Sequence, residues 1–338
     1  VVEGGSMSRI GQSQRKLGAL WGALAGDALG VPVEFLSRET VRRNPVKDMR
    51  GFGTHNQPAG TWSDDSSLLL CAVESLAHYG GLNPTDLGQR FVRWKSAGHW
   101  TPHGRVFDIG IATSQALSRL AMGMAPEESG GSDEQSNGNG SLMRIVPVAL
   151  WFDDLAPRDL AATAHRASAL THRHPRSQMA CALYCLVVRE LVAGAAAEDA
   201  FHNALKVFAE LYAQPPFVAE RSHFQLLEAG RLGGRSESEI DSTGYVMDTL
   251  TASIWCLLTS KSFEETVLKA VNLGGDTDTT GTVAGGLAGA FYGVEAIPTA
   301  WKEALARHDE IESLFTRFLS RHSASLVSLE PSKGSIKP

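Results

Sequence analysis

Apolar side chains recur along most of the chain at the spacing of amphipathic helices. The i, i+3, i+4 pattern occurs in residues 15–30, 64–77, 109–121, 160–172, 247–260 and 263–275. No run of five or more residues alternates between apolar and polar side chains, as a half-buried strand would. Residues 178–188 are apolar nearly all round, which is typical of a helix buried on every side. The pattern therefore predicts an all-α protein.

Glycine and proline pairs separate these segments, but no change of composition marks a second domain and no repeat of fixed period occurs. We therefore expect a single compact multi-helix bundle over residues 12–322. Residues 1–11 are interpreted as a disordered or expression-derived remnant, because VVEGGS precedes Met7. Residues 323–338 are interpreted as a frayed polar tail.

Composition and charge argue against several classes of partner. Lys and Arg total 31 against 37 Asp and Glu, a net charge of -6, and no long basic run argues for nucleic acid. No stretch of about 18 uninterrupted apolar residues predicts a membrane span, and no signal peptide is expected. The four cysteines are interpreted as buried thiols in a reduced compartment, so we expect a cytoplasmic protein. No heptad pattern indicates a coiled-coil partner, and we expect a monomer.

A serine and two aspartates, Ser63-Asp64-Asp65, stand directly ahead of an apolar helical segment. One such residue at a helix start is ordinary, because it caps free N–H groups and complements the positive end of the helix dipole. Two adjacent carboxylates and a hydroxyl exceed what capping needs. The segment therefore qualifies as a candidate ligand cluster.

A second cluster of the same kind lies about two hundred residues later, with Asp276, Asp278 and Thr279 ahead of a helix expected over residues 280–292. Carboxylates this close repel each other and raise each other's pKa, and a hard divalent cation removes the conflict. Neither cluster contains Cys or His, which argues against zinc. We expect the two clusters to meet across one cleft and to bind a pair of divalent cations.

Glycines recur at i, i+4 and i+8 behind the second cluster, at Gly281, Gly285 and Gly289. Each glycine inside a helix costs about 1 kcal/mol relative to alanine. Such a stripe is most simply a face to which another helix comes very close. Gly30, at the end of the first helical segment, is interpreted as its C-terminal cap.

Other polar residues have both a structural and a functional interpretation. Glu34 is either a solvated loop acid or a mobile acid that reaches a substrate. Residues 136–141, SNGNGS, are either an ordinary turn or a set of backbone N–H groups for phosphate. His172 suits a helix C-terminus, while Tyr245 and Asp108 suit a buried anchor and a helix cap.

In chain order, seven of these motifs resemble the ADP-ribosylglycohydrolase family, whose best-known bacterial member type is the dinitrogenase-reductase-activating glycohydrolase. The motifs are GALAGDALGVPVEF, GTWSDDSSLL, GRVFDIG, NGNGSLMR, SALTHRHP, GYVMDTL and LGGDTDTTGTVAGGLAGAFYG, over residues 17–293. The resemblance implies an all-α orthogonal bundle with two divalent metals, usually Mg²⁺ or Mn²⁺, in a central cleft. It also implies cleavage of the N- or O-glycosidic bond between ADP-ribose and an acceptor.

Carried over by position, the resemblance assigns roles to individual residues. The implied metal ligands are Ser63, Asp64, Asp65, Asp276, Asp278 and Thr279. The family usually has Thr where this chain has Ser63, and the hydroxyl is retained. The implied catalytic residues are Asp64, Asp108 and Glu34. The implied substrate-binding residues are Gly138, Asn139, Gly140, Ser141, His172, Tyr245 and Gly275.

The resemblance thus predicts a dimetal hydrolase that removes ADP-ribose from a modified protein. Asp108 matches an acid that can meet a guanidinium, which favours ADP-ribosyl-arginine. Glu34 matches an acid of members that act on serine-linked ADP-ribose, so ADP-ribosyl-serine and O-acetyl-ADP-ribose stay open as substrates. A metal-dependent phosphatase or nuclease and a non-catalytic ADP-ribose-binding protein are further alternatives.

Overall fold

The computed structural model describes residues 10–329 of the chain and the side chains of residues 10–324. Most of the predicted N-terminal remnant (1–11) and residues 330–338 of the predicted tail lie outside the described residues. Residues 323–329 of that tail belong to the last helix, which runs over His308–Leu329.

The described residues form helices joined by loops, with isolated bridges and no strand. The α-helices are α1 (Gln12–Gly30), α2 (Arg38–Arg43), α3 (Asp64–Tyr79), α4 (Pro84–Ala97), α5 (Ile111–Ala121), α6 (Val146–Trp151), α7 (Pro157–Ala169), α8 (Pro175–Val192), α9 (Ala197–Leu211), α10 (Gln225–Glu228), α11 (Val246–Leu258), α12 (Phe263–Val271), α13 (Thr277–Tyr292), α14 (Thr299–Ala304) and α15 (His308–Leu329). The 3₁₀ turns are η1 (Val31–Val33), η2 (Gly53–His55), η3 (Pro126–Glu128), η4 (Glu134–Ser136), η5 (Phe217–Phe224), η6 (Leu232–Gly234), η7 (Glu237–Glu239) and η8 (Val294–Ala296). The all-α prediction is confirmed.

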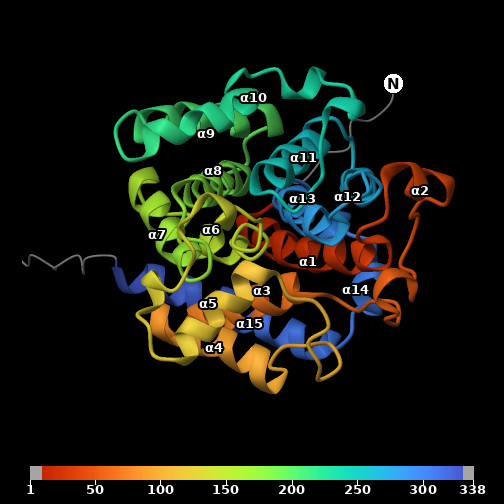
Figure 1. Cartoon of the computed structure of the whole chain (residues 1–338), viewed down its shortest axis with the longest axis horizontal. Helices are drawn as coiled ribbons and strands as arrows, with labels where there is room; N and C mark the ends of the chain where they lie inside the picture. The colour runs from red at the N-terminus through yellow and green to blue at the C-terminus, as the bar shows by residue number, and fades with distance from the viewer. Residues whose placement is uncertain (1–9, 330–338) are drawn as a thin grey trace, which may run out of the picture.

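Helices α1 and α13 lie side by side at the centre of the bundle (Figure 1). Helices α8, α11 and α12 pack on α13, while α3 packs on α4, α6 and α15. Among the described residues, no helix is both long and apolar enough to cross a bilayer. All four cysteines are buried free thiols, as the sequence predicts.

The glycine stripe of α13 meets a second glycine stripe on α1. A Cβ atom added to Gly285 would lie 2.1 Å from the carbonyl oxygen of Gly22, and one added to Gly22 would lie 2.3 Å from the carbonyl oxygen of Gly285. The same contact pairs Gly18 with Gly289 and Gly26 with Gly281, so the two helices run antiparallel. The predicted close approach is confirmed, and this set of six residues is called the glycine contact below.

Gly30 takes part in this packing rather than in helix capping. Its backbone has the right-handed helical angles φ -79° and ψ -38°, so the prediction that Gly30 is the C-terminal cap of the helix is wrong. A Cβ atom on Gly30 would lie 2.3 Å from the Cα atom of Asp278. A side chain is excluded here because the end of α1 abuts the first turn of α13.

Gly285→Ala should destabilise the protein, because the new methyl group would overlap the backbone of α1. Overpacking of this kind costs about 1–3 kcal/mol in the free energy of unfolding, measurable by urea denaturation. The matched control is Gly81→Ala, where no atom lies within 4 Å of the added Cβ and a change within about 0.5 kcal/mol is expected. Equal unfolding midpoints for the two variants would contradict the close helix contact.

Candidate active site

The two predicted acidic clusters come together where the N-termini of α3 and α13 converge. Ser63 caps α3, and its hydroxyl accepts a hydrogen bond from the Asp65 amide. Thr279 Oγ1, in the first turn of α13, donates to Asp65 Oδ1 at 3.2 Å. The prediction that the clusters meet is therefore confirmed.

Helix α13 begins earlier than predicted, at Thr277 rather than at Thr280. Asp276 occupies the N-cap position but its side chain makes no capping hydrogen bond. Gly275 leads into this turn with φ +73°, where a side chain would also strike the carbonyl oxygen of Ser242. The Asp276 carboxylate is thus turned away from the capping role and toward the other acids.

A cavity of about 300 Å³ opens between these helix ends. Ten of the predicted site residues line it: Glu34, Asp64, Asp65, Asp108, Gly138, Asn139, Gly140, His172, Asp276 and Thr279. The described residues that line this cavity include no Lys or Arg. The predicted residues Ser63, Asp278, Ser141, Tyr245 and Gly275 do not line it.

Acidic side chains accumulate in this cavity without a Lys or Arg among the described residues that line it. Burial raises the pKa of Asp64, Asp65 and Asp278 well above the usual range, and the neighbouring carboxylates raise these pKa values further. The positive ends of the helix dipoles at the start of α3 and α13 offset only part of this repulsion. A bound cation would supply the missing positive charge.

Two carboxylate oxygens at the site are buried without a hydrogen-bond partner among the described residues. They are Asp65 Oδ2, from α3, and Asp276 Oδ1, from the cap of α13. Ligand atoms of Glu34, Asp276 and Asp278 also lie within 4.8 Å of one another. Since Mg²⁺ and Mn²⁺ take carboxylate and hydroxyl oxygens, this donor set fits a hard divalent cation.

Asp27 is a functional candidate that the sequence analysis missed. This fully buried carboxylate of α1 accepts hydrogen bonds from the Ser63 amide at 3.0 Å, the Ser66 amide at 2.9 Å and Ser66 Oγ at 2.5 Å. Burial raises the pKa of Asp27 to about 6. Asp27 therefore positions the first turn of α3, and the signal was a lone acid in the apolar run GALAGDALG.

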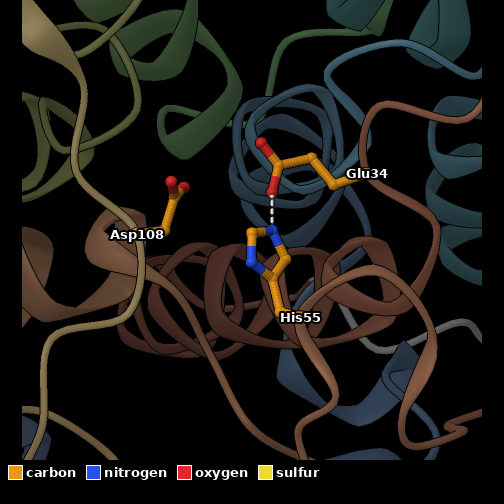
Figure 2. A group of neighbouring side chains, drawn as sticks. All are labelled: Glu34, His55 and Asp108. Carbon is orange, nitrogen blue, oxygen red and sulfur yellow. Dashed lines mark hydrogen bonds and ion pairs between the residues drawn. The ribbon is translucent and has the colours of Figure 1, made fainter.

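Glu34 is held inside the site by a histidine that the sequence analysis also missed. The His55 Nε2 atom pairs with Glu34 Oε2, and Asp108 lies nearby without a bond to either residue (Figure 2). Burial raises the pKa of Glu34 to about 7, and the bond to Glu34 raises the pKa of His55. No spacing in the sequence relates His55 to Glu34, so only the fold brings them together.

The backbone around Glu34 is tied down as well. Thr54 Oγ1 donates to the Glu34 carbonyl at 2.7 Å. The Phe35 amide donates to the Gly275 carbonyl at 2.7 Å, and the Gly275 amide donates to the Leu36 carbonyl at 2.8 Å. The interpretation of Glu34 as a solvated loop acid is wrong, because the residue is 4% exposed and is tethered beside Asp276.

Asn139 uses its polar groups within the protein. Its amide N–H donates to the Gly244 carbonyl, and its Nδ2 atom donates to Thr249 Oγ1 and to Asp276 Oδ2, both at 2.9 Å. The backbone N–H of Asn139 is therefore not free for phosphate. Instead, this side chain orients the Asp276 carboxylate whose other oxygen lacks a partner.

The fold gives three other predicted residues the following places. Ser141 is completely buried and its hydroxyl bonds to Ser168, so it belongs to the core. Tyr245 is the N-cap residue of α11 and bonds to Arg176 in an adjoining hollow. Asp108 is not a cap, because Gly110 occupies the N-cap position of α5.

His172 presents one ring nitrogen to the glycine loop of the cavity. Its Nδ1 lies 2.9 Å from Thr171 Oγ1, which accepts a bond from Arg144 Nη2 at 2.7 Å. Because Arg144 only donates, the Thr171 hydroxyl hydrogen can bond to His172 Nδ1, which leaves the ring proton on Nε2. Burial, and then Arg144, lower the pKa of His172 to about 3.

Comparisons with known proteins agree on one family. The sequence model of the ADP-ribosylglycohydrolase family matches residues 8–326. ADP-ribosylarginine hydrolase Tri1 of Serratia proteamaculans (strain 568) is 32% identical over 297 residues, 88% of this chain and 76% of the relative. ADP-ribosyl-[dinitrogen reductase] glycohydrolase of Rhodospirillum rubrum is 30% identical over 296 residues, 86% of this chain and 90% of the relative. A solved structure described as an ADP-ribosylglycohydrolase-related protein complex aligns with a TM-score of 0.77 and 35% identity, covering 92% of this chain and 99% of that one.

His172 should stay neutral between pH 5 and 8, because its pKa of about 3 lies well below that range. Nitrogen NMR of the imidazole should show a protonated Nε2 and an unprotonated Nδ1 with no titration in this window. The imidazole signal that is missing from the spectrum of the His172→Gln variant is assigned to His172. A midpoint above pH 5, or a proton on Nδ1, would refute the Arg144–Thr171–His172 arrangement.

Proposed function

The chain belongs to the ADP-ribosylglycohydrolase family, and we propose that it hydrolyses the N-glycosidic bond between ADP-ribose and an arginine side chain of a modified protein. The family makes it a glycosidase. The observation that carries the arginine preference is Asp108, a half-buried carboxylate that lines the same cavity as the paired helix-end acids. The name of the Serratia relative supports the same linkage.

The proposed metal centre is a pair of divalent cations, Mg²⁺ or Mn²⁺. The residues that would hold them are Ser63, Asp64, Asp65, Asp276, Asp278 and Thr279. The partnerless oxygens of Asp65 and Asp276 support this donor set. When bound, such cations supply Lewis acidity to the ribose oxygens and favour ionisation of a water molecule.

The chain's own residues would position ADP-ribose and handle the protons. Asp27 and Asn139 hold the acids of α3 and α13 in place. In the hydrolysis, a water oxygen forms the new bond to the anomeric carbon and the bond from that carbon to the guanidine nitrogen breaks. Asp64 or Asp108 would take the proton of the water and return a proton to the leaving nitrogen.

The guanidine group explains why an acid near the cavity matters. Without a proton on its nitrogen, the guanidine group would have to leave as a strongly basic anion, so departure as neutral guanidine needs a proton on that nitrogen. Burial raises the pKa of Asp108 above its usual value and Asp276 raises it further, while the positive charge of His55 lowers it in part. A carboxyl group in this environment suits proton transfer to the departing guanidine.

O-linked ADP-ribose is the second candidate substrate. The observation that favours it is Glu34, whose carboxylate lies within 4.8 Å of ligand atoms on Asp276 and Asp278. ADP-ribosyl-serine and O-acetyl-ADP-ribose therefore belong in the same assay. If the wild-type protein binds ADP-ribose but hydrolyses none of these substrates, the chain is a non-catalytic ADP-ribose-binding protein.

The hydrolysis panel should show release of ADP-ribose from ADP-ribosyl-arginine with Mg²⁺ and loss of that release with EDTA. The double variant Asp64→Ala/Asp276→Ala should be inactive, because both helix-end clusters lose a carboxylate. Asp199→Ala, an exposed acid in the first turn of α9, is the matched control and should retain activity. Mass spectrometry of released ADP-ribose measures each reaction, and full activity in EDTA would disprove the metal mechanism.

Asp108→Asn should lower kcat for ADP-ribosyl-arginine by roughly 100-fold or more, the usual contribution of a general acid or base. The amide keeps the shape of the side chain but transfers no proton at neutral pH. The dissociation constant for ADP-ribose, measured by calorimetry, should change much less. Unchanged kcat would remove Asp108 from the reaction.

A further inference from the structure

Two large apolar side chains stand exposed at the same cavity as the catalytic acids. Phe35 is 66% exposed and Ile111 is 79% exposed, and both line the cavity. Most apolar residues of this size in the described chain are buried in the core. These two side chains, called the rim below, therefore require an explanation.

Each rim residue lies in a segment that also carries one of the acids proposed to act on the substrate. Phe35 directly follows Glu34, and Ile111 begins α5 three positions after Asp108. Aromatic contacts connect the two segments: the His55 ring centroid lies 6.0 Å from that of Phe35 and 5.2 Å from that of Phe107. The rim thus borders the acids seen in Figure 2.

The backbone holds Phe35 outward in an unfavourable conformation. Its φ angle is +63°, which is uncommon for a bulky residue without a special reason. The hydrogen bond from its amide to Gly275 and the bonds around Glu34 maintain this conformation. The exposed ring is therefore pre-positioned rather than a loose side chain.

We propose that Phe35 and Ile111 dock the polypeptide that carries the modified arginine, by contact with apolar residues next to it. This inference rests on the proposed function. The bond to be hydrolysed would lie beside the acids, and Phe35 and Ile111 are the large apolar side chains that stand exposed among the described residues lining this cavity. The acids match the positive charge of a guanidinium, and the rim matches apolar side chains beside it.

The test compares three substrates: free ADP-ribosyl-arginine, and two peptides with ADP-ribosyl-arginine between leucines or between serines. The rim variant is Phe35→Asn/Ile111→Ser, because asparagine tolerates a left-handed backbone. The matched control is Met122→Ser, which removes an equally exposed side chain, 79%, from the other end of α5. Ile111→Ser alone provides a second variant that leaves the Glu34 segment untouched.

For the wild-type protein, kcat/KM should be higher with the leucine peptide than with the serine peptide. In the rim variant, KM for the leucine peptide should rise on the order of 10-fold relative to KM for free ADP-ribosyl-arginine, as for loss of an interface anchor. The preference for leucine should disappear, Ile111→Ser should show part of the effect, and Met122→Ser should match the wild type.

Several results would overturn the proposal. Equal losses with the free and peptide substrates would make the rim part of the nucleotide site, and no preference between the two peptides in the wild type would show that no docking occurs. Self-association of the wild type that the rim variant abolishes, seen by sedimentation, would make the rim an interface between two copies. Failure of the wild type to hydrolyse free ADP-ribosyl-arginine would instead reject the proposed function itself.

Discussion

The direct backbone contact between α1 and α13 is the constraint on which the rest of the site depends. The glycine contact removes every side chain that would separate the two helices. Helix α1 carries Asp27, which bonds to the first turn of α3, and α13 begins at the second acidic cluster. Because the two central helices touch at backbone distance, the acids of α3 and α13 are brought to one cavity with little freedom to move apart.

This placement concentrates carboxylates in a cavity whose described lining residues include no Lys or Arg. Burial and mutual repulsion raise the pKa of Asp64, Asp65 and Asp278. An apolar replacement would pack more favourably, so the acids are explained by ligand binding rather than by stability. The partnerless oxygens of Asp65 and Asp276 agree with that explanation. The stability lost at the site is offset elsewhere by a large buried core of aliphatic and aromatic side chains.

At the Glu34 segment of the cavity, one side chain is tethered inward and the next is exposed. His55 and the backbone bonds of the Glu34 segment hold an acid inward, while the next residue, Phe35, is held outward. The same short segment thus contributes a group to the reaction site and a surface beside it. The proposed hydrolysis of a modified protein would use both, since the ADP-ribose would enter the cavity and the polypeptide would stay outside.

The helical pattern, the two acidic clusters and the glycine stripe of α13 were predictable, because each is a local regularity: a 3.6-residue period, adjacent like charges, or a repeated spacing of four. The partner stripe on α1, the support from Asp27 and the pairing of His55 with Glu34 were not, since these residues lie in unrelated segments and carry no shared spacing. Local order also misjudged Gly30, whose role depends on the first turn of α13 that packs against it. The sequence by itself determined the helices and the chemistry available at their ends. Only the tertiary structure decided how those groups are oriented and which further residues hold them, because burial and contact arise from helix packing over hundreds of residues.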